Sequence, residues 1–359
     1  MARMQSSAVM KLVPDSESPS VSIIVPVYNG GEAFRRCLDA LAALSPKPLE
    51  LIVVANGDTD GSGKSAAASG ATVIRVPAAS GPALARNLGA QAARGAILFF
   101  VDADVVVPSD TVRRVAELFA QDSSLDAVIG SYDDAPGDPS FLSQYRNLLH
   151  HYVHQQGREE ASTFWGACGA IRRDLFIASG GFSDRYRKPS IEDIELGYRL
   201  KDAGARMRLC KALQVKHLKR WTLWGLLRTD LFQRAIPWTL LIYGRRHTPN
   251  DLNLSVQGRL STAAAFLLVC GMIAGIWWPP ALLSVGPAVG LLALLNWDFY
   301  RFCLRKRGLG FMGLAVLWHW LYFVYSGLGF ALGTAWHILG ACGASNWPGP
   351  RLTRMGVGR

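Results

Sequence analysis

Charged residues are missing from two long stretches near the end of this 359-residue chain. Residues 261–297 and 308–350 contain no Asp, Glu, Lys or Arg. A helix that crosses a bilayer needs about 20 mostly apolar residues, so each stretch is long enough to span one. The first 250 residues alternate apolar and charged stretches, as globular proteins do. The sequence therefore predicts a globular N-terminal part and a membrane C-terminal part.

Cysteine is scarce, and the chain does not open on a secretion signal. The six cysteines show no C-x-x-C spacing, which argues against a disulfide framework and against a zinc site. The first twenty residues lack the apolar core that a secretion signal requires. We therefore expect residues 1–19 to be a flexible N-terminus and the globular part to face the cytoplasm at the inner cell membrane.

Positive charge is abundant but concentrated in one region. The formal net charge is +11, and residues 201–250 hold eleven Lys or Arg and two Asp, which gives +9. Basic clusters beside membrane spans bind anionic lipid head groups and mark the cytosolic side. A nucleic-acid-binding protein would place such charge in a folded recognition element, which the sequence lacks. The predicted partner of this charge is a membrane and not a nucleic acid.

Apolar runs alternate with helix-like segments in the first hundred residues. The runs lie at 21–27, 49–55, 72–77 and 96–101, and segments with helical spacing or a helix start lie at 32–45 and 82–94. Uninterrupted apolar runs are typical of strands covered on both faces. The succession of strands and helices predicts an α/β fold, a mostly parallel sheet with helices on both faces. We expect the chain from residue 126 onward to extend this sheet and to form the second wall of a cleft.

Two carboxylates one residue apart, Asp102 and Asp104, follow the fourth run. Burying an unpaired carboxylate costs several kcal/mol, so this pair is expected at a strand end, facing positive charge. In parallel sheets ligands bind at the carboxyl ends of the strands. The pair suits a divalent cation, Mg²⁺ or Mn²⁺, that keeps positions open for phosphate oxygens. A solvated turn is the competing interpretation.

Taken in order, the motifs of residues 20–220 resemble the family 2 type of inverting glycosyltransferases. The stretches that carry the resemblance are VSIIVPVYNGG, ELIVVANGDTDGS, ARNLGAQAARG, FFVDADV, GGF and EDIELGYRLKDAGARM. The resemblance implies a GT-A fold, which is a nucleotide-diphospho-sugar transferase fold, at residues 20–220. It also implies a bacterial-like, membrane-associated and metal-dependent member that uses a nucleotide-diphospho-sugar donor.

The resemblance assigns donor binding to residues that follow the first two strands. Pro26, Tyr28 and Asn29 would begin the nucleotide pocket, and Asp60 would bind the base or the ribose. A simple strand-ending turn is the alternative for the first three residues.

This sequence departs from the family pattern after the second strand. The common pair of acids is replaced by Ala55 and Asn56, so Asn56 or Asp58 would have to take over the contact with the nucleotide. Arg86 lies on the helix after the third strand, where its guanidinium could reach the diphosphate. A surface position on that helix is the alternative. Asp102 would approach the ribose or the metal.

The second acidic site lies in SIEDIELGYRL, residues 190–200. Family position implies that Asp193 is the catalytic base, which takes the proton of an acceptor hydroxyl late in its attack on the anomeric carbon. A base of ordinary pKa suffices for that step, and we expect amides at the helix start to keep Asp193 ionised. The alternative is structural, because Ser190 three residues earlier fits a capping box.

The resemblance implies further contacts on both sides of the reaction. Asp104 would ligate the metal, and His217 stands where metal-dependent relatives place a third ligand. The metal would stabilise the departing nucleoside diphosphate. Trp165 and Glu192 are assigned to the acceptor side, where an aromatic face can pack on a sugar. A structural role is the alternative for His217, and core packing is the alternative for Trp165.

Residues 221–260 predict an amphipathic junction that lies in the membrane interface. Trp221 and Trp224 provide aromatic anchors there, and Arg228 and Arg234 stand between apolar residues.

Residues 261–340 predict about three spans. A hairpin at 261–278 and 280–297 precedes an apolar run at 309–340, which as a helix would measure about 48 Å against roughly 30 Å of hydrocarbon. One tilted span would fit this run. It would place the arginines of the tail, residues 341–359, outside, against the charge rule, so four short spans remain an alternative.

The sequence thus predicts a membrane-bound inverting glycosyltransferase that moves a sugar to a lipid-linked or lipid-like hydroxyl. One alternative is transfer to polyprenyl phosphate, an acceptor that is already an anion and scarcely needs a base. The other is a catalytically silent scaffold with this fold, which the departure at Ala55 and Asn56 would explain.

Overall fold

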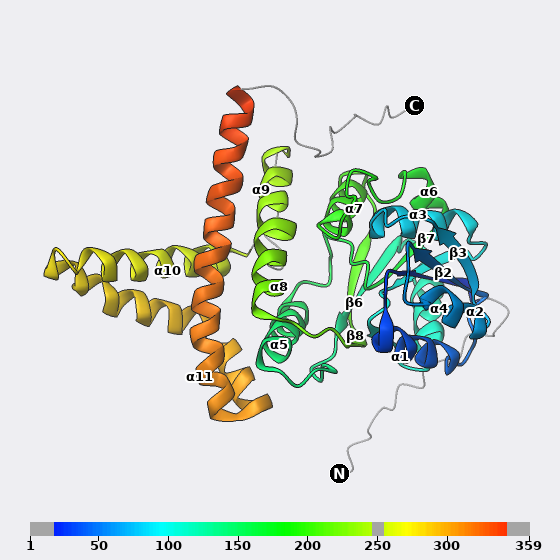
Figure 1. Cartoon of the computed structure of the whole chain (residues 1–359), viewed down its shortest axis with the longest axis horizontal. Coiled ribbons are helices and arrows are strands. Elements are labelled where there is room, and N and C mark those ends of the chain that lie inside the picture. Colours follow the sequence, from blue (N-terminus) through cyan, green and yellow to red (C-terminus); the bar gives the residue numbers. More distant parts are fainter. Residues whose placement is uncertain (1–17, 246–254, 343–359) are drawn as a thin grey trace, which may run out of the picture.

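The computed structural model describes residues 18–245 and 255–342, which form a globular domain and a set of long helices beside it (Figure 1). The predicted N-terminal segment and the predicted tail lie almost wholly outside the described residues, as do residues 246–254 of the predicted junction.

A sheet of eight strands, in the order β3-β2-β1-β4-β7-β6-β8-β5, runs through the globular domain. Its first half consists of the parallel strands β1 (Val21–Val27), β2 (Glu50–Asn56), β3 (Thr72–Val76) and β4 (Ile97–Val101). Its second half consists of β5 (Val105–Val106), β6 (Ala127–Tyr132), β7 (Cys168–Arg172) and β8 (Met207–His217). The predicted runs and the predicted extension after residue 126 are confirmed.

The second half of the sheet is mixed, because β7 is antiparallel to both of its neighbours, β4 and β6. Strand β6 consequently runs in the same direction as β4, and β8 pairs with β6 in parallel. The carboxyl ends of β1, β4, β6 and β8 therefore reach the same edge of the sheet.

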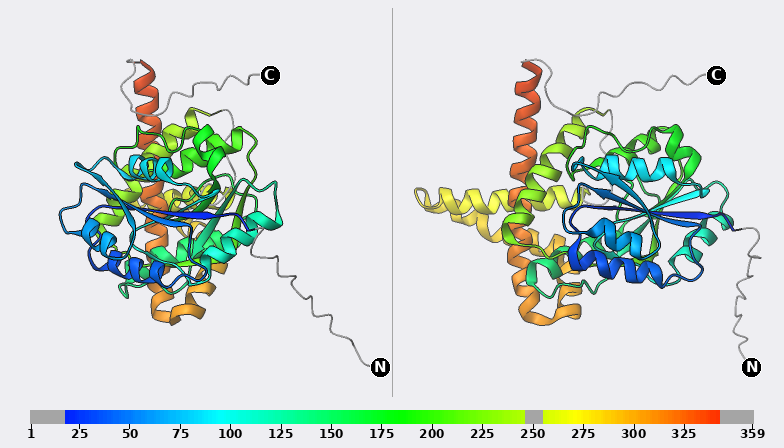
Figure 2. Two further views of the ribbon diagram at one scale, coloured as in Figure 1. Left: turned by 90° about the vertical axis from the view of Figure 1, so that its right-hand side faces the viewer. Right: turned by 45° about the vertical axis from the view of Figure 1, so that its right-hand side comes forward.

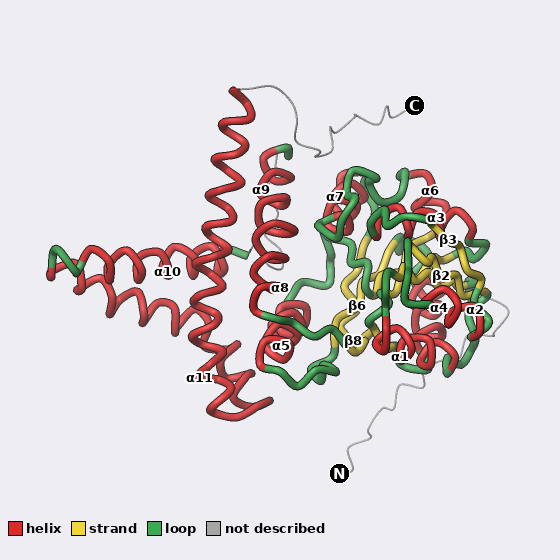
Figure 3. The backbone as a smooth tube through the Cα atoms, in the orientation of Figure 1, coloured by secondary structure: helices red, strands yellow, loops and turns green. Residues whose placement is uncertain are grey.

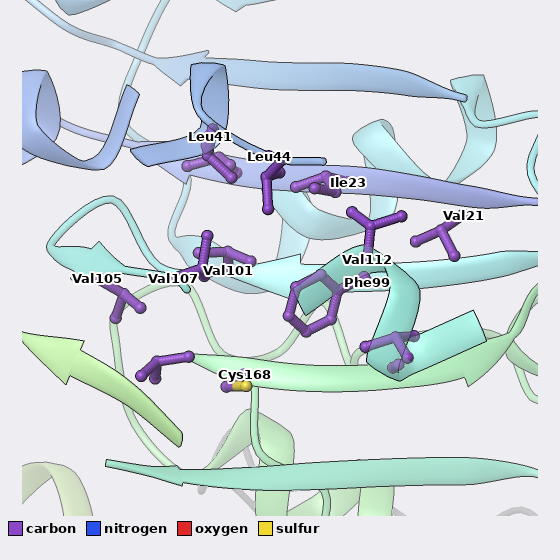
Figure 4. Packing of buried hydrophobic residues seen from close by; sticks show 14 of the residues in the cluster. Val21, Ile23, Leu41, Leu44, Phe99, Val101, Val105, Val107, Val112 and Cys168 are labelled. Atoms are coloured by element: carbon purple, nitrogen blue, oxygen red, sulfur yellow. The ribbon is translucent and has the colours of Figure 1, made fainter. Parts of the chain in front are cut away.

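Helices cover both faces of the sheet, as the uninterrupted apolar runs predict (Figure 2). One layer contains α1 (Gly31–Ala42), α2 (Ser62–Ala68) and α4 (Thr111–Gln121), and the other contains α3 (Pro82–Ala92), α6 (Arg173–Ala178) and α7 (Glu192–Asp202). Neighbouring residues alternate between the two cores. Ile23 and Phe99 pack in the first core (Figure 4), whereas Ile24 and Phe100 pack in the second.

The remaining helices lie on the side of β6 and β8. Helix α5 (Phe141–Gln156) packs on β6, and α8 (Leu223–Arg228), the π-helix η1 (Thr229–Ala235) and α9 (Ile236–Tyr243) follow one another in a single column (Figure 3). They are followed by α10 (Val256–Ala274), the short 3₁₀ helix η3 (Pro279–Ser284) and α11 (Val285–Cys342). Helix α11 is interrupted at Gly308, whose φ of 83° is not helical.

Two stretches of the described residues are long and apolar enough to cross a membrane. They are Val256–Ala274 and Pro279–Gly340, and the second contains the interruption at Gly308.

Candidate active site

The candidate site lies where the order of the sheet reverses. Strands β2 and β3 extend the sheet to one side of β1, and the chain then returns to place β4 on the other side. Such a reversal leaves a crevice outside the carboxyl ends of the two strands, where ligands bind in open α/β sheets. Asn29 after β1 and Asp102 after β4 stand at this crevice.

The loop after β1 is fastened to the loop after β2. Asn29, which has a left-handed φ of 49°, accepts a hydrogen bond from the Thr59 amide at 2.8 Å. Asp60 accepts from the Gly31 amide at 2.9 Å and from the Ser62 hydroxyl at 2.6 Å. The hydrogen bond from Ser62 is the main reason why the pKa of Asp60 is lowered.

The other predicted donor residues near β1 differ in exposure. Tyr28 is 59% exposed at the mouth of the crevice. Pro26 lies within β1, opposite Val54 of β2, and is only partly exposed.

The residues that replace the expected acids have structural partners. Asn56 is buried, and its amide donates to the Gly81 carbonyl at 3.0 Å and accepts from the Ser80 amide at 3.0 Å. It therefore fixes the turn that starts α3. Asp58 accepts from the Gly63 amide at 3.0 Å and holds the start of α2.

Arg86 links three elements of the site. Arg86 is 5% exposed, and its guanidinium donates to Asp102 at 2.7 Å and to Glu192 at 3.0 Å. Burial alone would lower the pKa of Arg86, but the charges of Asp102 and Glu192 outweigh it and raise the pKa. The positive charge that Asp102 faces is thus Arg86. Glu192, predicted on the acceptor side, is buried and is a partner of this arginine.

Gly166 makes room for this ion pair and also contacts the predicted base. A Cβ atom on Gly166 would lie 2.8 Å from the Arg86 guanidinium carbon. The Gly166 amide donates to Asp193 Oδ2 at 3.2 Å. The second Asp193 oxygen accepts from the Ile194 amide at 2.8 Å. The glycine therefore lets the loop before β7 approach both charged groups.

The environment of Asp193 raises its pKa to about 7. Withdrawal from water is the main cause and the charge of Glu192 adds to it, whereas Arg86 and the two amides act in the opposite direction. We expected helix-start amides to keep this carboxyl ionised; they do lower its pKa, but burial outweighs them, so it is only partly ionised near neutral pH.

The capping box that was the structural alternative for this segment is absent. Helix α7 begins at Glu192, and the Ser190 hydroxyl donates to the Gln233 carbonyl of η1 at 2.9 Å. Glu192 instead accepts from the Ser190 amide at 2.9 Å. Ser190 thereby ties the start of α7 to the helices beside the globular domain.

Asp104 and His217 face each other across a strand pair. Strand β5 pairs with β8 so that Val105 stands opposite His217, and the Asp104 carboxylate lies 3.6 Å from His217 Nε2. Withdrawal from water would raise the pKa of Asp104, but the interaction with His217 and the charge of Lys219 outweigh it and lower the pKa. Asp104 is therefore held in its anionic form.

Tyr132, at the carboxyl end of β6, is the centre of the site and was not predicted. Its ring stacks on His217 at 4.2 Å and meets Trp165 edge to face at 4.7 Å. Burial raises the pKa of its phenol, and the charges of Asp104, Asp102 and Asp193, in that order, raise it further. Three of the predicted site carboxylates thus raise the pKa of this one phenol. The rule that singled out Asp102, a position at a strand end, would also have found Tyr132.

Trp165 packs among the rings that surround Tyr132. Besides Tyr132 it contacts the rings of His150 at 4.8 Å and His154 at 5.3 Å, both on α5. It is only partly buried.

Asp104 and His217 are the residues that could hold a divalent cation. Among the described residues no three His, Cys, Asp or Glu side chains converge on one point, and Asp102 is engaged with Arg86. One carboxylate and one imidazole fit a cation whose other ligands are phosphate oxygens and water. The donor set thus suits a metal shared with a ligand rather than a closed metal centre.

Comparisons with known proteins agree with this fold. The mannosyltransferase PcManGT from Pyrobaculum calidifontis, solved in complex with GDP-Man and Mn²⁺, superposes with a TM-score of 0.57 at 19% identity. The superposition covers 88% of this chain and 87% of that protein. The globular domain therefore has the fold of a GT-A glycosyltransferase.

Sequence comparison finds a family model that matches part of the chain. Residues 22–180 match the family described as "Glycosyl transferase family 2". The glycosyltransferase GlyG of Streptococcus pneumoniae is 29% identical over 129 residues, which are 34% of this chain and 42% of that protein. The uncharacterized glycosyltransferase EpsJ of Bacillus subtilis is 40% identical over 114 residues, 31% of this chain and 33% of that protein. The match thus spans less than half the length of these curated relatives.

Proposed function

We propose that this chain is a membrane-bound, metal-dependent glycosyltransferase that moves a sugar from a nucleotide-diphospho-sugar, with inversion, to a lipid-linked or lipid-like hydroxyl. The observation that carries the proposal is a series of contacts at the carboxyl edge of the sheet. Asp104 lies 3.6 Å from His217, whose ring stacks on Tyr132. Tyr132 also meets Trp165, and the amide of the next residue, Gly166, donates to Asp193. Nucleotide sugars are anionic at the diphosphate and reactive at the anomeric carbon, and this edge offers a cation site and a base side by side.

The donor would enter the crevice between β1 and β4. Asn29 and Asp60 hold the two loops that line its nucleotide end, and Tyr28 stands exposed at its mouth, where a ring can stack on a base. Asp104 and His217 would hold Mg²⁺ or Mn²⁺, which supplies Lewis-acid stabilisation of the departing diphosphate when bound. Arg86 fixes Asp102 beside them.

Asp193 would act on the acceptor. The acceptor oxygen forms a bond to the anomeric carbon, the bond from that carbon to the diphosphate oxygen breaks, and the proton of the acceptor passes to Asp193. The amides of Gly166 and Ile194 hold one carboxylate oxygen each and so fix the direction from which the base works. A pKa of about 7 suits a base that has to accept a proton near neutral pH.

The acceptor is proposed to be lipid-like because of what lies next to the site. Ser190, two residues before the helix start at Glu192, is bonded to η1, and the neighbouring helices α10 and α11 expose many large apolar side chains. An acceptor anchored in a bilayer would approach from this side.

A transfer assay tests the proposal. Membranes that contain the full chain are incubated with radiolabelled UDP- and GDP-sugars, and the label is followed into solvent-extractable lipid. One donor is expected to transfer its label, with the opposite anomeric configuration in the product. Asp193→Asn should lower the transfer rate by about 10²–10⁴-fold, whereas Asp174→Asn, a change at an exposed carboxylate on α6, should leave it unchanged. Equal transfer by both variants would refute the assignment of the base.

A further inference from the structure

The direction of helix α11 changes at Gly308. This change affects which parts of the chain can cross a membrane. Helix α10 and the first part of α11 form a hairpin that points away from the globular domain, whereas the second part of α11 runs across the base of that hairpin (Figures 1 and 2). We propose that only this hairpin, residues 256–307, crosses the bilayer and that residues 309–342 lie along its cytosolic surface. The inference rests on the membrane attachment in the proposed function.

The base of the hairpin is fastened to the globular domain. Arg307, the last residue before the interruption, donates to Gln144 at 2.8 Å and to the Asp134 carbonyl at 2.7 Å. Lys306 forms an ion pair with Asp134 at 2.5 Å. These cationic groups hold the end of the second span at the water side, on the side where the globular domain lies.

The second part of α11 begins and continues against elements of the globular domain. The Phe311 ring lies 5.3 Å from Phe141 at the start of α5. Further along, the Tyr325 hydroxyl donates at 2.9 Å to Asp230, which also pairs with Arg146 of α5 at 2.9 Å. Two widely separated points of this helix are therefore held next to α5.

The far end of α11 is packed on α9. A Cβ atom on Gly333 would lie 2.8 Å from Thr239, and the His337 ring stacks on Tyr243 at 4.6 Å. The other side of α9 faces α7, where Trp238 donates to the Tyr198 hydroxyl at 3.0 Å. One helix thus separates α11 from the helix that carries Asp193.

These contacts exclude a crossing orientation for the second part of α11. From Phe311 to His337 the helix extends about 39 Å, which exceeds the roughly 30 Å of hydrocarbon in a bilayer. A bilayer around this length would also enclose α5 and α7, and α7 carries Glu192, Asp193 and Glu195 in its first turn. Charged groups are expelled from hydrocarbon, so this helix lies in the plane of the membrane.

The hairpin has the features of a true pair of spans. Helix α10 has 19 residues, which is about 28 Å and matches the hydrocarbon thickness. The most exposed apolar side chains near its tip are Ile276 at 72%, Trp277 at 77% and Leu283 at 80%. Tryptophan is enriched where a span reaches the opposite interface.

Two crossings also remove a conflict in the charge pattern. With three spans, Arg351, Arg354 and Arg359 would lie on the side opposite the globular domain. With two spans they return to the cytosolic side, as the positive-inside rule requires.

Labelling with a membrane-impermeant maleimide tests this arrangement in the full chain. Cysteines are introduced one at a time as Leu283→Cys at the tip, Ser345→Cys after α11 and Gln121→Cys on α4. The background carries Cys210→Ser, Cys270→Ser and Cys342→Ser and keeps only the buried Cys37, Cys168 and Cys303, and its own labelling is subtracted. In intact bacterial spheroplasts Leu283→Cys is expected to react, whereas the other two should react at least tenfold more after the membrane is permeabilised.

Two results would overturn the inference. Reaction of Ser345→Cys in intact spheroplasts would show a third crossing, and protection of Leu283→Cys until permeabilisation would show that the hairpin does not cross. Release of the chain by an alkaline wash would instead defeat membrane attachment itself, and with it this arrangement.

Discussion

Single carboxylates at this site differ in charge state because their neighbours differ. Asp104 is held anionic by His217, whereas burial and Glu192 raise the pKa of Asp193 to about 7. A base has to be ionised to accept a proton, so with Asp193 as the proposed base the active fraction should grow as the pH rises through this value. We therefore expect kcat/KM of the wild-type enzyme to increase between pH 6 and 8, with a midpoint near 7.

Asp193→Asn provides the comparison for that profile. Loss of a general base lowers the rate by about 10²–10⁴-fold, and the rising limb should disappear with it. A flat wild-type profile over this range would contradict the assignment. If the variant lost little activity, the acceptor would be one that is already an anion, as polyprenyl phosphate is.

The raised pKa of Asp193 also affects stability, with a definite sign. The folded state keeps a proton on this carboxyl up to a higher pH than the unfolded state does, so folding is favoured below the ordinary value and this contribution is lost as the pH rises to about 7. Thermal unfolding of wild-type and Asp193→Asn proteins should show a smaller pH dependence for the variant over this interval. An unchanged pH dependence would mean that the carboxyl is already ionised.

We expect removal of the buried charge of Arg86 to lower the free energy of unfolding more than removal of an exposed charge does. Arg86→Met would leave Asp102 and the buried Glu192 without their cation, and breaking a buried pair costs about 3–5 kcal/mol. Arg35→Met, which breaks an exposed pair with Glu32, should cost less than about 1 kcal/mol. Thermal unfolding of the two variants measures the difference. Equal stability would show that the Arg86 pairs contribute nothing net.

Packing between helices depends on small residues at the crossings. A Cβ atom on Gly329 of α11 would lie 2.6 Å from Ala235 of η1, whereas one on Gly313 of the same helix would meet nothing within 4 Å. Gly329→Val should therefore destabilise the protein by about 1–3 kcal/mol through overpacking. Gly313→Val carries the same change in helix propensity and should have little further effect. A similar melting temperature for both variants would argue against this contact.

The strands were predictable where both faces are covered, and the later elements were less so. Strand β4 is itself a run of five buried apolar residues, Ile97–Val101, a pattern typical of a strand covered on both faces. The direction of β7 relative to the sheet depends on the strands with which it pairs, β4 and β6. The local sequence of β7 does not determine these partners. The same holds for Ser190, whose partner, the Gln233 carbonyl, lies 43 residues away.

The sequence predicted the acidic residues of the site but not the residues with which they pair. Sequence motifs or family positions indicated Asp102, Asp104, Asp193 and His217. The structure brings these residues to the carboxyl edge of the sheet. The ion pairs of Arg86 form across the fold, so the sequence could indicate a charge but not its counter-ion. The raised pKa of Asp193 reflects burial, which a helix-start pattern does not report.

The whole molecule combines a globular α/β domain with a strongly apolar set of helices. Hairpin side chains such as Trp277 and Leu283 are far more exposed than a soluble protein would leave them. We expect the full chain to remain in the membrane pellet after washing at high salt and at alkaline pH, because two spans anchor a protein independently of charge. Fractionation followed by immunoblotting measures this, and full release by high salt alone would contradict it.

The central claim is that Asp104 helps to hold a divalent cation against the diphosphate of a nucleotide. Calorimetric titration of the purified full chain with UDP or GDP, with and without Mn²⁺, measures it directly. The account predicts that one nucleotide binds only with Mn²⁺, that Asp104→Asn weakens this binding at least tenfold, and that Asp122→Asn at the surface leaves it unchanged. If neither nucleotide bound, the chain would be a silent scaffold, and if Asp104→Asn bound as the wild type does, the proposed cation site would be wrong.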